Sequence, residues 1–410
     1  MTSLSNKILS DPVNRWVFSR AGTEVYLVGG FLRDILLSRN SGDLDYVVRG
    51  KPGELGRKLS KKFKGTFINL NKYSTTRVVL KDGKSIDFTS LESSIQNDLE
   101  KRDFAINAMA WSPDKKLIDP YGGLNDLRNK VIKVVRTANL GADPLRILRA
   151  YRHAVQLGFT IHKETRRALS IYADRIAEVA SERITYELCK ILNHHKADNN
   201  LLKCFDDKVL EKILLMKKDR LRKNLSLLRR YRLFIEKNRE SVESNYELGK
   251  FNKFLNKEVS QGLTSAGLIR LSILLIDSTN DIRKARHMRF SININKAVRS
   301  IHAAVRQSEE RITENKLYEI FRTAGEYPLE AAHVISTIKS RNYIRIIKSA
   351  EDYINISKKK LLSGDDIKSL LHVRQGVMIG DIKTDLHKNR FLKKVSTKAE
   401  ARDWLLSNFK

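Results

Sequence analysis

Cysteine is scarce in this sequence, and so are several other features that define classes of protein. Only two cysteines and six prolines occur among 410 residues. Cys189 and Cys204 are too few for a disulfide framework or a zinc site, and so few prolines leave long helices uninterrupted. The sequence has no apolar run of about 18 residues and no lipidation signal, and its first residues lack the apolar stretch of a secretion signal. We therefore predict a cytoplasmic, helix-rich protein without membrane spans.

Negative charge is also in short supply. The chain carries 78 Lys and Arg residues against 47 Asp and Glu residues, which gives a formal net charge of +31. Solubility alone could account for a basic surface, but an excess of this size favours a polyanionic partner, either a membrane surface or nucleic acid. Because nothing in the sequence anchors it to a bilayer, nucleic acid is the partner that the charge predicts.

The strand-like runs are confined to residues 26–135, and the pattern of apolar and polar residues changes after Asn139. The first part predicts a small mixed β-sheet, preceded by one short helix over residues 1–24. From Asn139 on, apolar residues recur at three- and four-residue spacing, which predicts helices almost to the end of the chain. The predicted fold class is therefore α+β: a sheet-containing head followed by an all-helical remainder.

Two features of phosphate chemistry lie close together in the segment YLVGGFLRDILLSRNSGDLDYVV. An apolar strand leads into Gly29 and Gly30 and then into a helix, which lets backbone N–H groups approach an anion. Arg33, one turn into that helix, can add a bidentate phosphate contact. In the next strand Asp43 and Asp45 are two residues apart, so both carboxylates point to one face. Carboxylates that face a phosphate cradle predict metal-assisted phosphoryl transfer, with Mg²⁺ bound by both aspartates and a triphosphate.

A second candidate site begins at Asp143, which we expect to cap a helix that has Pro144 at its first position. Arg146 lies three residues further on and so on the same helix face. A carboxylate accepts from the exocyclic amine of C or A while an arginine donates to the adjacent ring nitrogen, and U and G present the opposite pattern. The pair can therefore select C and A without a nucleic-acid template. Arg149 and Arg152 continue the row, where they suit a triphosphate or the backbone of a primer.

Together these motifs resemble the class II tRNA nucleotidyltransferases and the related bacterial poly(A) polymerases. Besides LVGGxxRDxLL…DxD, the resemblance rests on KRDFAINAMA, DPYGGLNDL, ADPLRILRAYR and SERITYELCK, which match the family motifs RRDFTINA, DPxGGxxDL, EDxxR and SxERIxxELxKIL. It implies a nucleotidyltransferase head (1–138), a helical neck that recognises the base (139–200), a helical body (201–320) and a helical tail that binds tRNA (321–410). The body is the part in which the resemblance is least specific.

The resemblance also implies the chemistry. Asp43 and Asp45 are the expected catalytic residues and metal ligands, Mg²⁺ is the expected cofactor, CTP and ATP are the substrates, and tRNA is the acceptor. Arg102, in the KRDFAINAMA segment, is expected to contact nucleotide or primer phosphates. Asp103 and Asn107 are expected to hold the site together by hydrogen bonds.

Three activities share this scaffold: full CCA addition, partial addition of CC or A, and poly(A) synthesis. Poly(A) polymerases of the group carry an RFxLxHV-like segment, which TFINLNKYSTTRVVL lacks. The stretch between Phe88 and Arg102 is short, as in members that add only CC, so we predict CC addition, which leaves the final A to a second nucleotidyltransferase. Poly(A) synthesis and a non-catalytic RNA-binding role are the alternatives. Two positions stay open: Asp87 is either a third metal ligand or a plain strand residue, and Ala142 replaces the Glu of the family motif.

Overall fold

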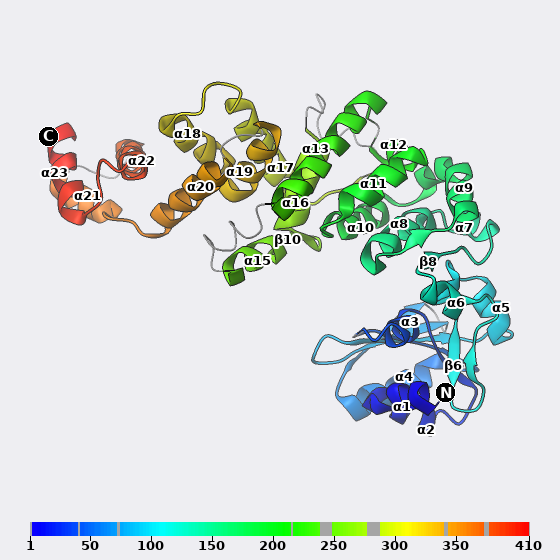
Figure 1. Cartoon of the computed structure of the whole chain (residues 1–410). Helices are drawn as coiled ribbons and strands as arrows, with labels where there is room; N and C mark the ends of the chain where they lie inside the picture. The colour runs from blue at the N-terminus through cyan, green and yellow to red at the C-terminus, as the bar shows by residue number, and fades with distance from the viewer. Residues whose placement is uncertain are drawn as a thin grey trace. The chain divides into compact units, whose positions relative to one another are not determined.

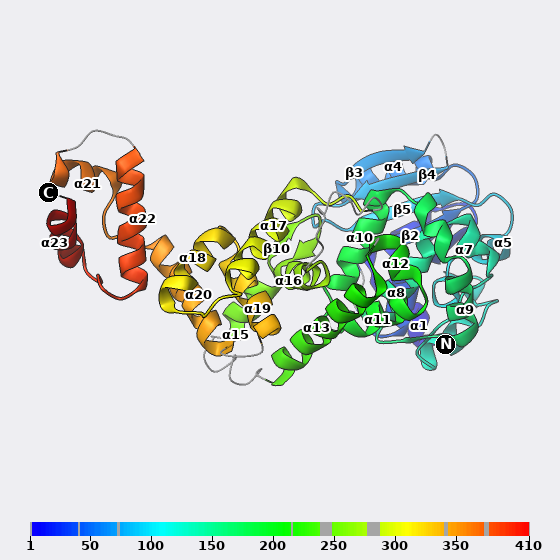
Figure 2. The same cartoon turned by 90° about the horizontal axis from the view of Figure 1, so that it is seen from above.

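The computed structural model describes residues 2–39, 42–71, 74–214, 216–237, 248–276, 288–339, 343–372 and 377–409. It divides the chain into two compact units. The first comprises Met1–Ala180 with Lys203–Lys212, and the second comprises Ser181–Leu202 with Ile213–Lys410. The main β-sheet lies in the first unit, and the second unit is built chiefly of helices (Figures 1 and 2). The division into head, neck, body and tail is finer than these two units and stays a prediction.

The first unit is organised around a seven-stranded mixed sheet with the strand order β3-β4-β5-β2-β1-β6-β7. Its strands are β1 (Val25–Val28), β2 (Leu44–Val48), β3 (Thr66–Asn71), β4 (Thr75–Val79), β5 (Ser85–Ser90), β6 (Ala110–Ser112) and β7 (Lys116–Ile118). β2 and β5 run parallel, and the other neighbours are antiparallel. β1 is apolar at every position because it is a central strand that is buried on both faces. This sheet and the mostly helical chain after it confirm the predicted α+β fold class.

Two helices, and not one, precede the sheet. The sequence analysis predicted a single helix over residues 1–24, whereas the structure has α1 (Thr2–Ser10) and α2 (Pro12–Arg20). The Asp11 carboxylate accepts hydrogen bonds from two backbone N–H groups in the first turn of α2, and Pro12 occupies the first helical position. An aspartate followed by a proline is a strong helix start, so the chain begins a new helix there.

The two faces of the sheet carry different side chains. On one face the rings of Phe18, Tyr46, Phe88 and Trp111 pack together: the centroids of Phe18 and Trp111 are 5.1 Å apart, and those of Tyr46 and Phe88 are 5.2 Å apart. On the other face a buried apolar cluster joins β1 and β2 to α5 (Ile95–Glu100). Because side chains alternate along a strand, polar residues at the ends of β1 and β2 can share this second face with the apolar cluster.

Strand register carries the predicted site residues to one end of that second face. Val28, the last residue of β1, pairs with Asp45 in β2, and Asp45 pairs in turn with Asp87 in β5. The sequence analysis placed Asp43 within this strand, whereas in the structure Asp43 lies just before β2. The chain leaves β1 directly into α3 (Gly30–Leu36). The start of α3 and both aspartates therefore lie at the same end of the sheet.

The rest of the first unit is mostly helical. It contains α4 (Pro52–Phe63), η1 (Ala105–Asn107), α6 (Gly123–Arg128), α7 (Ala138–Ala142), α8 (Leu145–Leu157), α9 (Lys163–Ile171) and η2 (Ala173–Glu178), and a parallel pair of short strands, β8 (Val131–Ile132) and β9 (Thr160–Ile161). Residues 203–212 return to this unit. There Asp207 accepts hydrogen bonds from the Tyr151 hydroxyl at 2.7 Å and from the Arg166 guanidinium at 2.6 and 3.0 Å.

The second unit is built around α16 (Ser265–Leu274), in which every residue is buried. A helix that is covered on all sides is an internal element of a helical assembly. The helices packed against it are α10 (Ser181–Leu192), α13 (Lys218–Lys237), α15 (Leu248–Asn256), α17 (Ile292–Gln307) and α19 (Pro328–Lys339). Within α16 the buried Arg270 donates a hydrogen bond to the carbonyl oxygen of Leu192 at 2.9 Å, which satisfies the end of α10.

The remaining elements of the second unit complete the helical part. They are α18 (Glu314–Ala324), α20 (Tyr343–Lys358) and three helices that share an apolar cluster: α21 (Gly364–Leu371), α22 (Val377–Phe391) and α23 (Lys398–Phe409). The chain passes between the two units within α11 (Ala197–Asp206) and α12 (Val209–Leu214). The helical part also contains a hairpin of β10 (Glu258–Ser260) and β11 (Leu263–Thr264), so the remainder is mostly helical and not all-helical. The sequence did not predict this hairpin, because strands of two and three residues are too short to show a periodic pattern.

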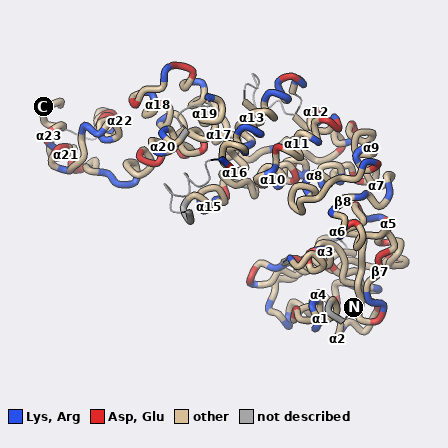
Figure 3. The backbone as a smooth tube through the Cα atoms, viewed as in Figure 1, with Lys and Arg blue, Asp and Glu red and all other residues tan. Residues whose placement is uncertain are grey.

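Lys and Arg residues, blue in Figure 3, occur along the chain in both units and are not confined to one segment. Across the ranges that the structure describes, no helix combines the length and the apolar character that a membrane crossing needs.

Candidate active site

A cavity of about 550 Å³ in the first unit brings the predicted site residues together. Every residue assigned to nucleotide or metal binding from the sequence lines it: Gly29, Gly30, Arg33, Asp43, Asp45, Arg102, Asp143, Arg146, Arg149 and Arg152. These residues come from the ends of β1 and β2, from α3, from the segment after α5 and from α8. The two motifs that the sequence places about 100 residues apart therefore form one site.

The two carboxylates at the start of β2 differ in their surroundings. Asp43 accepts a long hydrogen bond of 3.3 Å from the backbone N–H of Ser85. Burial raises the pKa of Asp45, while Arg102 acts in the opposite direction. In the described part of the chain, no group donates a hydrogen bond to the Asp45 carboxylate. A partly buried carboxylate without a donor is stabilised by a cation, so this pair, in which Asp45 is half-buried and Asp43 is exposed, fits a divalent ion. Mg²⁺ suits the pair, because it is held by one or two carboxylates and by substrate phosphates.

No group of three or more His, Cys, Asp and Glu side chains in the described ranges is arranged as a metal cage. Asp87 pairs with Asp45 in register, but it does not line the cavity. Both of its oxygens accept hydrogen bonds from Arg77, with distances of 2.8 and 2.7 Å. Of the two readings that the sequence left open, this ion pair favours the strand residue over the third metal ligand.

Gly29 is required by its conformation and by its neighbours. Its φ is +77°, in the region that favours glycine, and a Cβ at this position would lie 2.9 Å from Oδ2 of Asp45. At Gly30 a Cβ would meet only the flexible end of Arg33, at 3.4 Å. The first glycine of the pair therefore lets the backbone pass close to the carboxylate.

Arg33 does not present the free bidentate edge that we expected to meet a phosphate. Its Nε and Nη2 atoms donate to the two oxygens of Asp34 at 2.8 and 2.9 Å, and Nη1 donates to Oδ1 of Asn107 at 2.8 Å. The guanidinium still lines the cavity as a positive charge with two N–H groups left over. Asp34 carries most of this positioning. The sequence analysis gave it no role, although its place beside Arg33 was a usable signal.

Asp103 connects the KRDFAINAMA segment to α8. Oδ1 accepts hydrogen bonds from the Asn107 amide at 3.1 Å and from a backbone N–H, and Oδ2 accepts from Nε and Nη2 of Arg149 at 2.8 and 2.6 Å. Burial acts to raise the pKa of this carboxyl, but Arg149 and the other donors outweigh it and hold the pKa below its ordinary value. The expected hydrogen-bonding role of Asp103 and Asn107 is thus seen, and it positions Arg149 as well.

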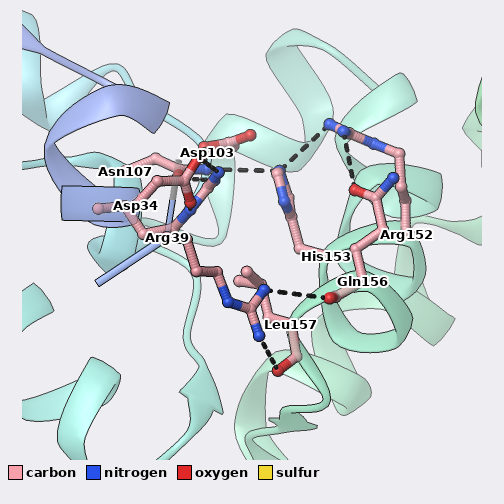
Figure 4. Close-up of polar contacts among 9 residues, drawn as sticks. Asp34, Arg39, Asp103, Asn107, Arg152, His153, Gln156 and Leu157 are labelled. Atoms are coloured by element: carbon pink, nitrogen blue, oxygen red, sulfur yellow. Dashed lines mark hydrogen bonds and ion pairs between the residues drawn. The ribbon is translucent and has the colours of Figure 1, made fainter. Parts of the chain in front are cut away.

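His153 is a cavity residue that the sequence analysis missed. Its Nε2 lies 3.4 Å from the Asn107 amide nitrogen and 3.2 Å from a guanidinium nitrogen of Arg152, and Figure 4 shows it between these two side chains. Burial and the charge of Arg152 lower the pKa of this histidine, so the ring is neutral. It lies four residues after Arg149 on α8, and this spacing was the signal that could have found it.

The start and the end of α8 are both fixed. At the start, Oδ1 of Asp143 accepts a hydrogen bond of 3.3 Å from the backbone N–H of Leu145, the first residue of α8, but the cap position that we expected Asp143 to take is occupied by Pro144. At the end, the Arg39 guanidinium donates to the carbonyl oxygens of Gln156 and Leu157 at 3.2 and 3.3 Å (Figure 4). Arg39 follows α3, so this contact ties the two helices that line the cavity to each other.

Known proteins match the chain in sequence and in fold. Two family models match it: the Poly A polymerase head domain over residues 25–94 and 73–133, and the probable RNA- and SrmB-binding site of polymerase A over residues 158–217. A CC-adding tRNA nucleotidyltransferase of Synechocystis sp. is 29% identical over 387 residues, which cover 92% of this chain and 91% of the relative. Another, from Geobacter sulfurreducens, is 43% identical over 176 residues, which cover 42% of this chain and 41% of the relative.

A solved CCA-adding enzyme of Thermotoga maritima, complexed with tRNA, has a TM-score of 0.75 at 23% identity, with 99% of this chain and 98% of that chain covered. The likeness extends the shared fold to the whole chain. In sequence and in fold the chain is therefore similar to tRNA nucleotidyltransferases of the CC-adding and CCA-adding kinds. Asp143, Arg146 and His153 lie between the two stretches that match family models. What places them in the site is the geometry of the cavity that they line.

Proposed function

We propose that the protein is a template-independent tRNA nucleotidyltransferase that adds C, or C and A, to the 3′ end of tRNA from CTP and ATP. The cavity carries this proposal, because it joins a carboxylate pair, a set of arginines and a candidate base-reading pair in one space. The names of the relatives give the same activity. The basic composition of the chain suits a tRNA partner.

In the proposed reaction the 3′-hydroxyl of tRNA attacks the α-phosphorus of the nucleotide, and pyrophosphate leaves. Asp43 and Asp45 would hold Mg²⁺, which when bound neutralises triphosphate charge and lowers the pKa of the attacking hydroxyl. Arg102 is oriented by Asp98, whose Oδ2 accepts from its Nε and Nη2 at 3.0 and 2.9 Å, and it faces the phosphates from the head. Arg33, held by Asp34 and Asn107, adds positive charge from α3.

Base selection falls to the start of α8. The Asp143 carboxylate accepts from the exocyclic amine of C or A, and Arg146 donates to the neighbouring ring nitrogen. U and G would leave both side chains without hydrogen-bond partners in a closed site. Discrimination between substrates is strongest when the wrong substrate leaves polar groups of the site unpaired. Arg149 and Arg152 are fixed by Asp103 and His153 and supply positive charge along the same helix.

We further propose that addition stops at CC. In support, the segment between β5 and Arg102 is short and packed: Leu91, Ile95 and Leu99 are all buried in the cluster under the sheet. Such packing would restrain the segment from acting as a lever that readjusts the pocket from C to A. Both relatives named above are CC-adding enzymes, and CCA-adding enzymes are similar to the chain as well. A second nucleotidyltransferase would then complete the terminus.

The test uses two tRNAs, one ending at the discriminator base and one ending in CC, each offered CTP, ATP or both with Mg²⁺. We expect two C residues on the first and nothing on the second. Addition of A to the CC-ending tRNA contradicts the CC-only proposal and leaves the wider one intact. Long A tails on an unstructured oligonucleotide would instead indicate poly(A) synthesis. RNA binding without any pyrophosphate release would indicate the non-catalytic alternative.

A further inference from the structure

A second cavity, of about 380 Å³, lies in the second unit between α18, α20 and α22. It is distinct from the candidate active site, which belongs to the first unit. Its wall combines rings and cations: Tyr318 and Tyr353 from α18 and α20, and four basic side chains, Arg322, Lys360, Lys383 and Arg390. No Asp or Glu is among its lining residues in the described chain. A space of this size, with aromatic and basic walls, is matched to a planar, negatively charged molecule.

The frame of the cavity is tied together across the three helices. The Tyr318 hydroxyl donates to the carbonyl oxygen of Thr384 at 3.0 Å, which joins α18 to α22. Ser357 on α20 and Nε2 of His387 on α22 share a hydrogen bond of 2.9 Å. The Tyr353 ring packs edge-on against His387 with 5.0 Å between centroids. These contacts hold the three helices together around the cavity.

Acidic groups compensate only some of the positive charges around the opening of this cavity. Arg322 has one distant partner, Glu319, at 3.6 Å. Arg390 donates to backbone carbonyl oxygens, including that of Ile356 at 3.3 Å. In the described ranges, no carboxylate lies within ion-pair distance of Lys360 or Lys383, and both side chains are exposed. The ligand that this arrangement recognises is therefore anionic.

We propose that this cavity binds one unpaired nucleotide of the RNA substrate. Its base lies against the half-buried ring of Tyr353, and its phosphate faces Lys360 and Lys383. Protein sites for unpaired bases use this combination, in which an aromatic face stacks on the base and cations follow the backbone. Residues of this site fall on both sides of position 320, where the sequence analysis placed the boundary between body and tail. This site would therefore add contact with a single base to the tRNA binding expected of the tail. The inference relies on the proposed function only for the identity of the RNA.

The test measures tRNA affinity of the full chain by fluorescence anisotropy at fixed salt. Tyr353→Leu removes the stacking face and keeps an apolar side chain, whereas Tyr353→Phe keeps the ring. We expect the dissociation constant to rise about tenfold for Tyr353→Leu, as for a base that loses an aromatic partner, and to stay within about twofold for Tyr353→Phe. Equal affinity of Tyr353→Leu and the unmodified protein overturns the proposal.

Two double variants separate a specific phosphate contact from general attraction. Lys360→Gln with Lys383→Gln removes two charges at the cavity, and Lys348→Gln with Lys358→Gln removes two exposed charges from α20 outside it. We expect a loss of about tenfold for the first pair and about twofold for the second. Equal losses contradict the proposal.

Cross-linking locates the nucleotide. We expect tRNA that carries 4-thiouridine at its unpaired uridines to cross-link to peptides of α18, α20 or α22, and no such product from Tyr353→Leu. Exclusive cross-linking elsewhere overturns the site. Turnover at saturating tRNA should equal that of the unmodified protein in every variant. A failure of the proposed function would appear differently, as absence of nucleotide addition by the unmodified protein.

Discussion

The Nε2 atom of His153 lies 3.2 Å from Arg152 and 3.4 Å from the side-chain amide of Asn107. A guanidinium and an amide NH₂ can only donate, so this nitrogen accepts and the ring carries its proton on Nδ1. Asn107 continues the chain of contacts to Arg33 and to Asp103. One neutral ring therefore orients groups from α8 and from the segment after α5.

We expect His153→Phe to lower kcat/KM for CTP by about 10- to 100-fold, because hydrogen bonds to a charged group contribute about 1.5–3 kcal/mol. The ring keeps its edge contact with Phe104, so folding is conserved. His153→Gln restores an acceptor and should recover most of the rate. Steady-state CTP incorporation measures both. If the Phe and Gln variants lose the same activity, the acceptor role is wrong.

Asp43→Ala and Asp45→Asn should each reduce nucleotide addition by at least about 10³-fold, since the metal contributes several kcal/mol of charge stabilisation. Their affinity for tRNA should change by less than about twofold. Asp87→Asn is the matched control, because Asp87 is paired with Arg77 outside the cavity. It should keep activity within about tenfold and the same Mg²⁺ dependence. A Mg²⁺ requirement that shifts strongly in this variant would instead make Asp87 a ligand.

Gly29→Ala should reduce activity about 100-fold, because the new Cβ would lie 2.9 Å from Oδ2 of Asp45 and a displacement of about 1 Å at a reacting group has this effect. Gly22→Ala is the control for backbone strain alone. It has a φ of +58° and no atom within 4 Å of the added Cβ. We expect Gly22→Ala to lose about 1–2 kcal/mol of stability and Gly29→Ala to lose about 1–3 kcal/mol, because the ψ of Gly29 is −146°. Only Gly29→Ala should lose activity. If Gly29→Ala and Gly22→Ala were equally active, the Asp45 side chain could move away from the added Cβ without loss of function.

The stability of the second unit should depend on pH through His333. Burial lowers its pKa to about 3, and it packs between aromatic rings such as Phe254 at 5.9 Å. The unfolded chain binds a proton on this residue near pH 6.5, so in acid the unfolded state holds more protons than the folded one. Stability is therefore full above about pH 6.5 and is lost as the pH falls toward 3.

His333→Phe should flatten this dependence. Between about pH 6 and pH 4, urea unfolding of the unmodified protein should lose about 1 kcal/mol more per pH unit than the variant does. Parallel stability curves for the two proteins would show that His333 is not responsible.

Local patterns predicted which residues line the cavity, because each motif lies beside the start or the end of a strand or a helix. The apolar run of β1 fixed the position of Gly29, and Asp143 with Pro144 marked the start of α8. The cavity brings Gly29 and Asp143 together, although the sequence gives no distance between them. Only the resemblance of both motifs to those of one protein family indicated that the two residues belong to one site.

What the sequence did not reveal depends on partners that are distant along the chain. Arg33 is held at its Nη1 atom by Asn107, which is 74 residues away. His153 acquires its role from Asn107, which is 46 residues away. β8 and β9 are two residues each and exist only because they pair with one another. Such short elements carry no periodicity of their own.

Asp207 gives the chain a rule about where it can be divided. Its carboxylate accepts hydrogen bonds from Tyr151 and Arg166 of the first unit, but it lies in a segment that follows part of the second unit in sequence. A recombination that joins the first 180 residues of this protein to another body would leave a buried hydroxyl and a guanidinium without their carboxylate. A joint placed after Lys212 keeps all three. Exchange of modules between relatives should therefore succeed at the second position and fail at the first.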